Sequence, residues 1–174
     1  MNAMVNIKAI GANGVLPVKL GFNGAYFEFE IIGGPFDAYR PGVNADFGVC
    51  VRAERVPKTA DVHLPIHDFD VPRDQSEVDV AITDTLEALL AGKRVYVGCM
   101  GGWGRTGLFL ALLAKVAGSA DPVGYVRSNY TPRAVETKEQ MAYVHDFDVL
   151  PLQSNLFWTA WRRRWTKTMF WWVP

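Results

Sequence analysis

The spacing of hydrophobic and polar residues changes several times along this chain, and each change predicts an element. Between residues 15 and 36, strand-forming residues alternate loosely with polar ones and glycines interrupt them, which predicts two or three short strands. The segment 47–54, FGVCVRAE, predicts another strand, and VHLPIHDF follows it after a turn-like stretch. The short run KRVYVG at 93–98 predicts one more strand.

Helical spacing begins further along the chain. Apolar residues recur at steps of three or four between 76 and 90, which predicts a helix. Ser76 and Asp79 fit a capping box at its start, and Gly92 fits its C-terminal end. The segment 107–118 is apolar nearly all round, as expected for a buried helix. Helices are also predicted at 122–130 and 136–147.

Strands that alternate with helices in this order favour an α/β fold with a mainly parallel central sheet flanked by helices. A chain of 174 residues is long enough for one domain with one core. We therefore expect a single domain over 1–174. It would consist of a β-rich segment at 1–45, a core at 46–150 that carries the candidate chemistry, and a Trp/Arg-rich segment at 151–174.

The composition is that of an ordinary globular protein, with 49% hydrophobic and 21% charged residues. Eighteen basic residues balance eighteen acidic ones, so no net field attracts the chain to nucleic acid and any anion site must be local. No apolar window is long enough for a membrane span, and the first residues lack the features of a signal peptide. We therefore expect a soluble, cytoplasmic protein.

Two cysteines, Cys50 and Cys99, are too few for a disulfide scaffold and lack the spacing of a zinc site. His63 and His67 have no cysteine or carboxylate partners at metal-binding spacing, so we expect them on the surface or in packing. Neither a metal nor another cofactor is expected.

The most informative stretch is GCMGGWGRTG at 98–107, which joins a predicted strand to a predicted helix. A glycine-rich loop at a helix N-terminus directs several backbone N–H groups at one point, and such a cradle binds phosphate. A nucleotide-binding Walker loop would need a glycine where Cys99 stands and a lysine where Arg105 stands. The stretch therefore predicts a phosphate cradle of another kind, and the alternative is a buried cysteine beside a tight turn.

A cysteine at the base of this cradle points to nucleophilic chemistry. The loop amides and the helix dipole would stabilise the Cys99 thiolate and bind the phosphoryl oxygens. Arg105 can grip two of those oxygens in a bidentate contact that lysine cannot make. The Thr106 hydroxyl is expected near the sulfur, where it would stabilise the thiolate as a leaving group. The predicted substrate-binding residues are Met100, Gly101, Gly102, Trp103, Gly104 and Arg105.

The motif C-x5-R-[ST], which runs from Cys99 to Thr106, resembles the signature of the cysteine-dependent protein tyrosine and dual-specificity phosphatases. The longer form C-x-x-G-x-G-R-T-G is similar to the branch that contains the kinase-associated and tensin-type enzymes. This resemblance implies a protein tyrosine phosphatase-like fold. It also implies a reaction through a phosphocysteine intermediate that needs no metal and no cofactor.

The resemblance implies a general acid in an upstream loop of the form Pro-x-x-Asp-x-x-x-Pro. The stretch LPIHDFDVP matches this form and assigns the acid to Asp68, 31 residues before Cys99. Asp70 is the rival, and without the resemblance both aspartates would be taken as solvated turn residues. Downstream, PRAVETKEQMAYV is similar to the segment in which these phosphatases carry a glutamine that positions the hydrolytic water. This similarity implies that role for Gln140, and Arg133 is a candidate helper in phosphate binding.

Three residues depart from the family pattern or extend it. Gly98 stands where the family usually has histidine, which implies a less ordered loop and reduced activity. Met100 and Trp103 stand where phosphoinositide-directed members tend to be basic, which favours phosphotyrosine over an inositol headgroup. Trp103 can equally pack against a neighbouring loop.

Two further features allow alternative interpretations. The apolar surroundings of Cys50 favour a buried small side chain, whereas the tensin-type resemblance implies a redox partner that forms a disulfide with the nucleophile. In the tail, tryptophans recur at helical spacing beside three arginines. The segment 157–172 would therefore either pack on its own domain or make a peripheral membrane contact.

The resemblance implies a phosphatase that acts on phosphorylated proteins or peptides, and we expect phosphotyrosine as its substrate, with phosphoserine and phosphothreonine as further candidates. The alternatives are an RNA 5′-phosphatase, a phosphoinositide phosphatase and a catalytically weak phosphate-binding module. The balanced charge argues against a nucleic-acid partner.

Overall fold

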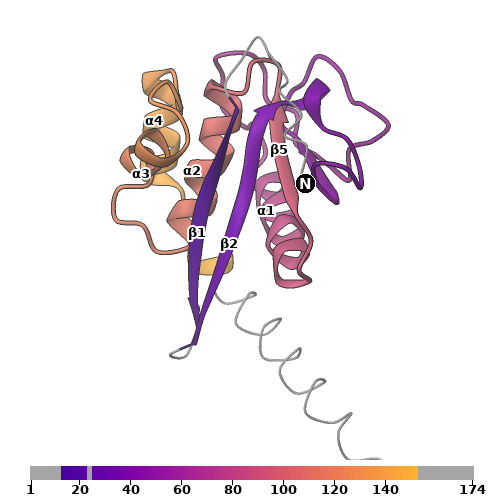
Figure 1. Ribbon diagram of the computed structural model, residues 1–174. Helices are drawn as coiled ribbons and strands as arrows, with labels where there is room; N and C mark the ends of the chain where they lie inside the picture. The colour runs from indigo at the N-terminus through magenta and orange to yellow at the C-terminus, as the bar shows by residue number, and fades with distance from the viewer. Residues whose placement is uncertain (1–12, 23–24, 153–174) are drawn as a thin grey trace, which may run out of the picture.

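The structure is a computed structural model that describes residues 13–22 and 25–152. Within these residues the centre is a five-stranded sheet with the order β1-β2-β5-β3-β4. Figure 1 shows β1, β2 and β5 side by side. β1 runs antiparallel to β2, and the other neighbouring pairs are parallel. The strands are β1 (Gly14–Phe22), β2 (Ala25–Pro35), β3 (Phe47–Cys50), β4 (Val62–His63) and β5 (Val95–Cys99). The predicted α/β fold with a mainly parallel sheet is therefore confirmed.

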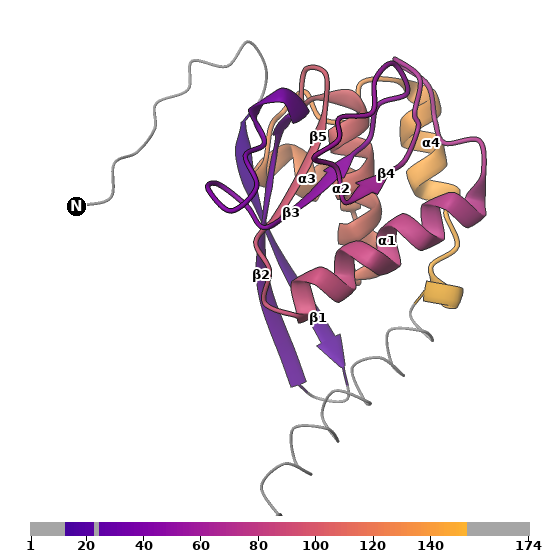
Figure 2. The same cartoon turned by 90° about the vertical axis from the view of Figure 1, so that its right-hand side faces the viewer.

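The α-helices of the described residues pack on one face of this sheet, which Figure 2 shows from the side. They are α1 (Gln75–Leu90), α2 (Gly104–Val116), α3 (Pro122–Asn129) and α4 (Lys138–Asp146). α2 is buried on nearly all sides, as its apolar sequence predicts. The opposite face holds a smaller cluster of Phe36, Tyr39, Ala45, Cys50 and Tyr96, next to the short 3-10 helix η1 (Phe36–Ala38).

The ends of α1 show where local sequence signals succeed and where they fail. Gly92 adopts a φ of 79° just beyond the helix, and its amide donates to the Leu89 carbonyl, so the predicted C-terminal glycine is confirmed. The predicted capping box is wrong. Asp74 is the N-cap instead, because its carboxylate accepts hydrogen bonds from both the amide and the hydroxyl of Ser76.

The hairpin of β1 and β2 forms one end of the sheet. Leu16, Val18 and Leu20 of β1 are buried and their neighbours point outward, as expected for a strand with one face on the core. In the antiparallel register Gly14 lies opposite Gly33. This glycine pair leaves a bare patch of backbone on the sheet.

The parallel strands bring their carboxyl ends to one edge of the sheet. In the register, Cys99 at the end of β5 lies beside Pro35 of β2, and Gly98 lies beside Cys50 of β3. The loops that leave these three strands therefore meet at the same edge, where α/β proteins commonly place their ligands. The predicted strand at 47–54 ends at residue 50, so residues 51–54 belong to this loop region.

The tail lies outside this description. Residues 153–174, and with them the proposed contact surface at 157–172, are not among the described residues. In the part of the chain that is described, no helix combines the length and the apolar character needed to cross a bilayer.

Candidate active site

The loop between β5 and α2 wraps around the side chain of Cys99. The Gly102 amide donates to Cys99 Sγ at 3.2 Å, and Gly102 has a φ of 79° that glycine adopts without strain. The Cys99 amide donates to the Thr106 hydroxyl oxygen at 2.9 Å. The predicted contact of Thr106 is thus made to the backbone of Cys99, so the hydroxyl fixes the start of the loop. Cys99 is only 3% exposed and lies at the bottom of the cradle.

Gly98 is glycine because the backbone of a neighbouring segment lies against it. A Cβ at this position would lie 2.8 Å from the Gly34 carbonyl oxygen and equally close to backbone atoms of Phe36. Atoms of a main chain cannot move aside as the end of a flexible side chain can. The histidine that the family usually carries there has no room in this chain, and packing explains the departure.

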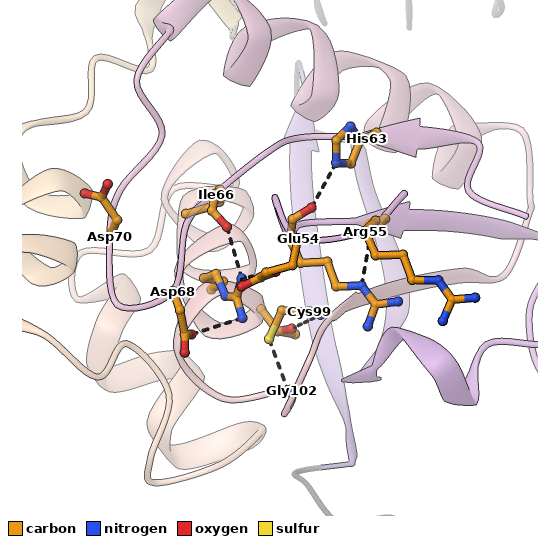
Figure 3. A network of polar contacts seen from close by, with 12 residues as sticks. Glu54, Arg55, His63, Ile66, Asp68, Asp70, Cys99 and Gly102 are labelled. Carbon is orange, nitrogen blue, oxygen red and sulfur yellow. Dashed lines mark hydrogen bonds and ion pairs between the residues drawn. The ribbon is translucent and has the colours of Figure 1, made fainter. Parts of the chain in front are cut away.

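Arg105 reaches the cradle from the first turn of α2 and is 3% exposed. Its Nη1 donates to both carboxylate oxygens of Glu54, at 2.6 and 2.8 Å, and to the Ile66 carbonyl at 3.1 Å. Its Nη2 lies 3.0 Å from Oδ1 of Asp68. Figure 3 shows Glu54, Ile66 and Asp68 converging near Cys99. The guanidinium therefore ties together the three loops that form the site.

Glu54 is a site residue that the sequence interpretation missed. Burial opposes ionisation of its carboxyl, but hydrogen bonds from its own backbone and from Arg105, with the charge of Arg52, outweigh this effect and lower the pKa of Glu54. Its position in the sequence could have identified it. Glu54 follows a buried strand, and the carboxyl ends of parallel strands meet at one edge of the sheet, where ligands commonly bind.

Of the two candidate acids, the structure brings Asp68 to Arg105. Asp68 is 59% exposed and faces the guanidinium, whereas the Asp70 carboxylate accepts from the Val71 amide at 2.8 Å and pairs with Arg73 at 3.6 Å. Figure 3 shows the two aspartates pointing in different directions. Phe69, which lies between them, has a φ of 59°, which is uncommon for a bulky residue. This backbone conformation turns the side chains of Asp68 and Asp70 in different directions.

Gln140 is fully buried at the start of α4. Its amide oxygen accepts from the Glu136 amide at 2.9 Å, and its amide nitrogen donates to the Asp70 carbonyl at 3.1 Å. The structure thus connects Gln140 to the loop of Asp68 through the backbone. A role in positioning water stays a prediction.

Trp103 and Arg133 form one side of the cradle. The Arg133 guanidinium carbon lies 4.1 Å from the centroid of the Trp103 ring, a cation–π contact between the cradle and the segment before α4. Trp103 precedes the first residue of α2 and is half-buried. The packing of Trp103 against a neighbouring segment is thus observed, and a role in substrate choice stays a prediction.

Cys50 and Cys99 belong to different side-chain clusters. Cys99 packs with the main core, whereas Cys50 belongs to the smaller cluster on the other face of the sheet. Burial raises the pKa of the Cys50 thiol, which donates to the Arg55 carbonyl at 3.8 Å. The redox pairing of Cys50 with Cys99 stays a prediction.

The histidine of β4 has a structural partner, since His63 Nε2 lies 2.9 Å from the Arg52 carbonyl oxygen. Residues 13–22 and 25–152 contain no cluster of three or more histidine, cysteine or carboxylate side chains that could hold a metal ion.

Two proteins of Methanocaldococcus jannaschii are similar to this chain. The uncharacterized protein MJECL20 is 35% identical over 98 residues, 56% of this chain and 66% of that protein. The uncharacterized protein MJ0215 is 36% identical over 86 residues, 49% of this chain and 54% of that protein. The similarity therefore spans less than two thirds of either relative.

Solved structures of phosphatases share the fold. The crystal structure of Tk-PTP in the active form is 27% identical, with a TM-score of 0.52, over 64% of this chain and 80% of that chain. Kinase-associated phosphatase, with its catalytic cysteine substituted by serine, aligns over 77% of this chain and 94% of its own, with a TM-score of 0.51 and 20% identity.

The model of one family matches residues 51–155, which include Cys99, Arg105, Asp68 and Gln140. Its description is the DSP-PTPase phosphatase domain of Swiss Army Knife proteins. The match covers more than half of the chain and spans the whole of the cradle. This protein belongs to that family of dual-specificity and tyrosine phosphatase domains.

Proposed function

We propose that this protein hydrolyses phosphotyrosine in proteins or peptides through a phosphocysteine intermediate. The observation that carries the proposal is the convergence of three groups on one cradle. The Cys99 sulfur accepts from a loop amide, and the Arg105 guanidinium and the Asp68 carboxyl lie in contact with each other beside it. These are the nucleophile, the anion-binding group and the proton donor that phosphoryl transfer to sulfur requires.

In the first step the Cys99 thiolate attacks phosphorus, the P–S bond forms and the bond from phosphorus to the leaving oxygen breaks. Asp68 gives its proton to that oxygen, so the leaving group departs as a neutral phenol. Loop amides and Arg105 stabilise the charge on the equatorial oxygens in the transition state. In the second step a water molecule attacks phosphorus, Asp68 accepts its proton and the P–S bond breaks to release inorganic phosphate.

The entering phosphate competes with Asp68 for the guanidinium. Nη1 of Arg105 is held by Glu54 and by the Ile66 carbonyl, whereas Nη2 faces Asp68. A bound phosphate would take over Nη2 and release the Asp68 side chain toward the leaving oxygen. Glu54 would keep the guanidinium in place during this exchange.

The rim of the site supports an aromatic substrate. Phe69, next to the proposed acid, is 61% exposed, and Met100, next to the nucleophile, is 56% exposed. Large apolar side chains at the mouth of a phosphate cradle favour a phenyl ring over a polar sugar. Glu54 and Asp68 also offset the charge of Arg105, which disfavours a polyphosphorylated headgroup.

Hydrolysis of p-nitrophenyl phosphate in the presence of EDTA tests the reaction. We expect metal-independent turnover that Cys99→Ser abolishes, and vanadate should inhibit it competitively. Vanadate binding without turnover would reject the enzyme and support a binding module. A panel of phosphotyrosine peptides, phosphoserine peptides, phosphoinositides and 5′-triphosphorylated RNA tests the substrate, and a preference for any of the last three would reject phosphotyrosine.

A further inference from the structure

Tyr130, at the C-terminal end of α3, contacts the cradle but has no role in the reaction proposed above. Its hydroxyl donates to the Gly102 carbonyl at 2.6 Å. The amide of the same Gly102 donates to Cys99 Sγ at 3.2 Å. The two peptide groups on either side of the Gly102 α-carbon are therefore fixed, one by Tyr130 and the other by the sulfur.

Gly102 needs such an external contact. Glycine samples more backbone conformations than any other residue, and its φ of 79° is one that other residues rarely adopt. Next to it in the loop, Gly101 has the same freedom. The hydrogen bond from Tyr130 to the Gly102 carbonyl limits this freedom from outside the loop.

The hairpin of β1 and β2 determines where the Tyr130 ring lies. A Cβ on Gly33 would lie 2.6 Å from the ring, and a Cβ on Gly14 would lie 2.8 Å from it. These two glycines are cross-strand partners, so together they form a flat slot for the ring. Any side chain in this slot would displace Tyr130 from Gly102.

The phenol keeps its proton in this slot. Burial, together with the nearby charge of Cys99, raises the pKa of Tyr130 above its ordinary value. A neutral phenol can donate to a carbonyl, whereas a phenolate cannot. The contact with Gly102 is therefore retained over the pH range in which a cysteine phosphatase works.

We propose that Tyr130, seated on the Gly14–Gly33 pair, is a positioning residue that holds Gly102 through its carbonyl, so that the Gly102 amide points toward the sulfur of Cys99. For its effect on turnover the proposal rests on the proposed phosphatase function. It extends the catalytic apparatus to Gly14 and Gly33 of the β1–β2 hairpin, which lies wholly before the matched family segment 51–155.

The test compares Tyr130→Phe with Tyr125→Phe. Tyr125 provides a matched control because its hydroxyl also joins α3 to a carbonyl, that of Pro17 in β1 at 2.7 Å, without touching the cradle. Tyr130→Phe keeps the ring and removes one hydrogen bond. We expect kcat for p-nitrophenyl phosphate to fall about tenfold with KM changed less than twofold, because the lost contact acts on transition-state stabilisation. Tyr125→Phe should keep wild-type kcat.

Alkylation of Cys99 provides a readout that needs no turnover. At one fixed pH, iodoacetamide should modify Cys99 about threefold more slowly in Tyr130→Phe than in wild type and Tyr125→Phe, because the Gly102 amide is then held less firmly against the sulfur that it activates. Gly33→Ala, which displaces the ring from the other side, should slow alkylation as well. A wild type that lacks turnover but shows this difference would reject the phosphatase and leave the positioning role standing.

Two results would overturn the positioning role. One is a Tyr130→Phe protein with wild-type kcat and wild-type alkylation. The other is an equal loss in Tyr130→Phe and Tyr125→Phe, since that pattern would trace the effect to the packing of α3. Thermal unfolding of each variant separates either result from a loss of folded protein.

Discussion

Arg105 Nη1 donates to both carboxylate oxygens of Glu54, at 2.6 and 2.8 Å. One side of the guanidinium is thus anchored to the loop after β3, while Nη2 faces Asp68 and the cradle. An arginine that must bind phosphate in a set orientation loses less conformational entropy when its stem and one nitrogen are already held. We therefore expect Glu54 to hold Arg105 in the orientation that the proposed phosphate substrate needs.

Replacing Glu54 with glutamine tests whether Glu54 anchors the Arg105 guanidinium. Glu54→Gln keeps the size of the side chain but removes its charge and one strong acceptor, so Arg105 is held less firmly. We expect kcat/KM for p-nitrophenyl phosphate to fall about tenfold and vanadate to bind correspondingly more weakly. Glu28→Gln, which removes an exposed partner of Lys19 on the hairpin, is the control and should change neither value. Unchanged kinetics in Glu54→Gln would contradict the anchoring role.

Asp68→Asn should separate the two candidate acids. Loss of a general acid costs on the order of a hundredfold or more in rate, and the cost is largest when the leaving group is a poor one. We expect kcat to fall more for phenyl phosphate than for p-nitrophenyl phosphate, since nitrophenolate leaves without protonation. Asp70→Asn should change both rates less than threefold, because its carboxylate is turned to Val71 and Arg73. A larger loss in Asp70→Asn would reassign the acid.

Much of the cradle could be predicted because its information is local. Cys99, Gly102, Arg105 and Thr106 lie within eight consecutive residues that join a buried strand to an apolar helix, and glycine spacing and helix direction follow from such a stretch alone. Asp68 was located by a loop pattern, again without knowledge of packing. The helix end at Gly92 is a similar local signal.

Other parts of the site depend on packing between distant segments. Glu54 and Tyr130 contact the cradle from loops that precede and follow it, and no short pattern marks either residue as a site residue. In the sequence, Gly98 is only a departure from the family pattern. Its reason becomes clear from the structure, where the backbone of Gly34 and Phe36 lies against it.

The predicted N-cap of α1 was wrong for a simpler reason. Asp74 and Ser76 are both residue types that cap helices well, and the path of the chain into the helix decides which of them does so.

Acid stability should depend on the pair of Asp46 and Arg94. Hydrogen bonds from Arg94 lower the pKa of Asp46 to about 2, whereas an aspartate in an unfolded chain titrates near 3.9. The pair therefore stabilises the folded protein above about pH 4, and this contribution is lost as the pH falls toward 2. Urea unfolding between pH 2 and 5 should show a shallower pH dependence in Asp46→Asn than in wild type. Arg94→Gln should have the same effect, and wild-type pH dependence in both variants would contradict the prediction.

Restoring a side chain at residue 98 should harm the protein. In Gly98→Ala the new Cβ would lie 2.8 Å from the Gly34 carbonyl oxygen and the Phe36 backbone, and overpacking of this kind costs about 1–3 kcal/mol of unfolding free energy. Gly98→His, the residue that the family usually carries, should be less stable still. Gly101→Ala is the matched control, because its Cβ would meet the Trp103 ring at 3.6 Å, an ordinary van der Waals contact. Urea midpoints at constant m-value measure the difference. If Gly98→His were as stable as wild type and more active, the packing explanation for this glycine would be wrong.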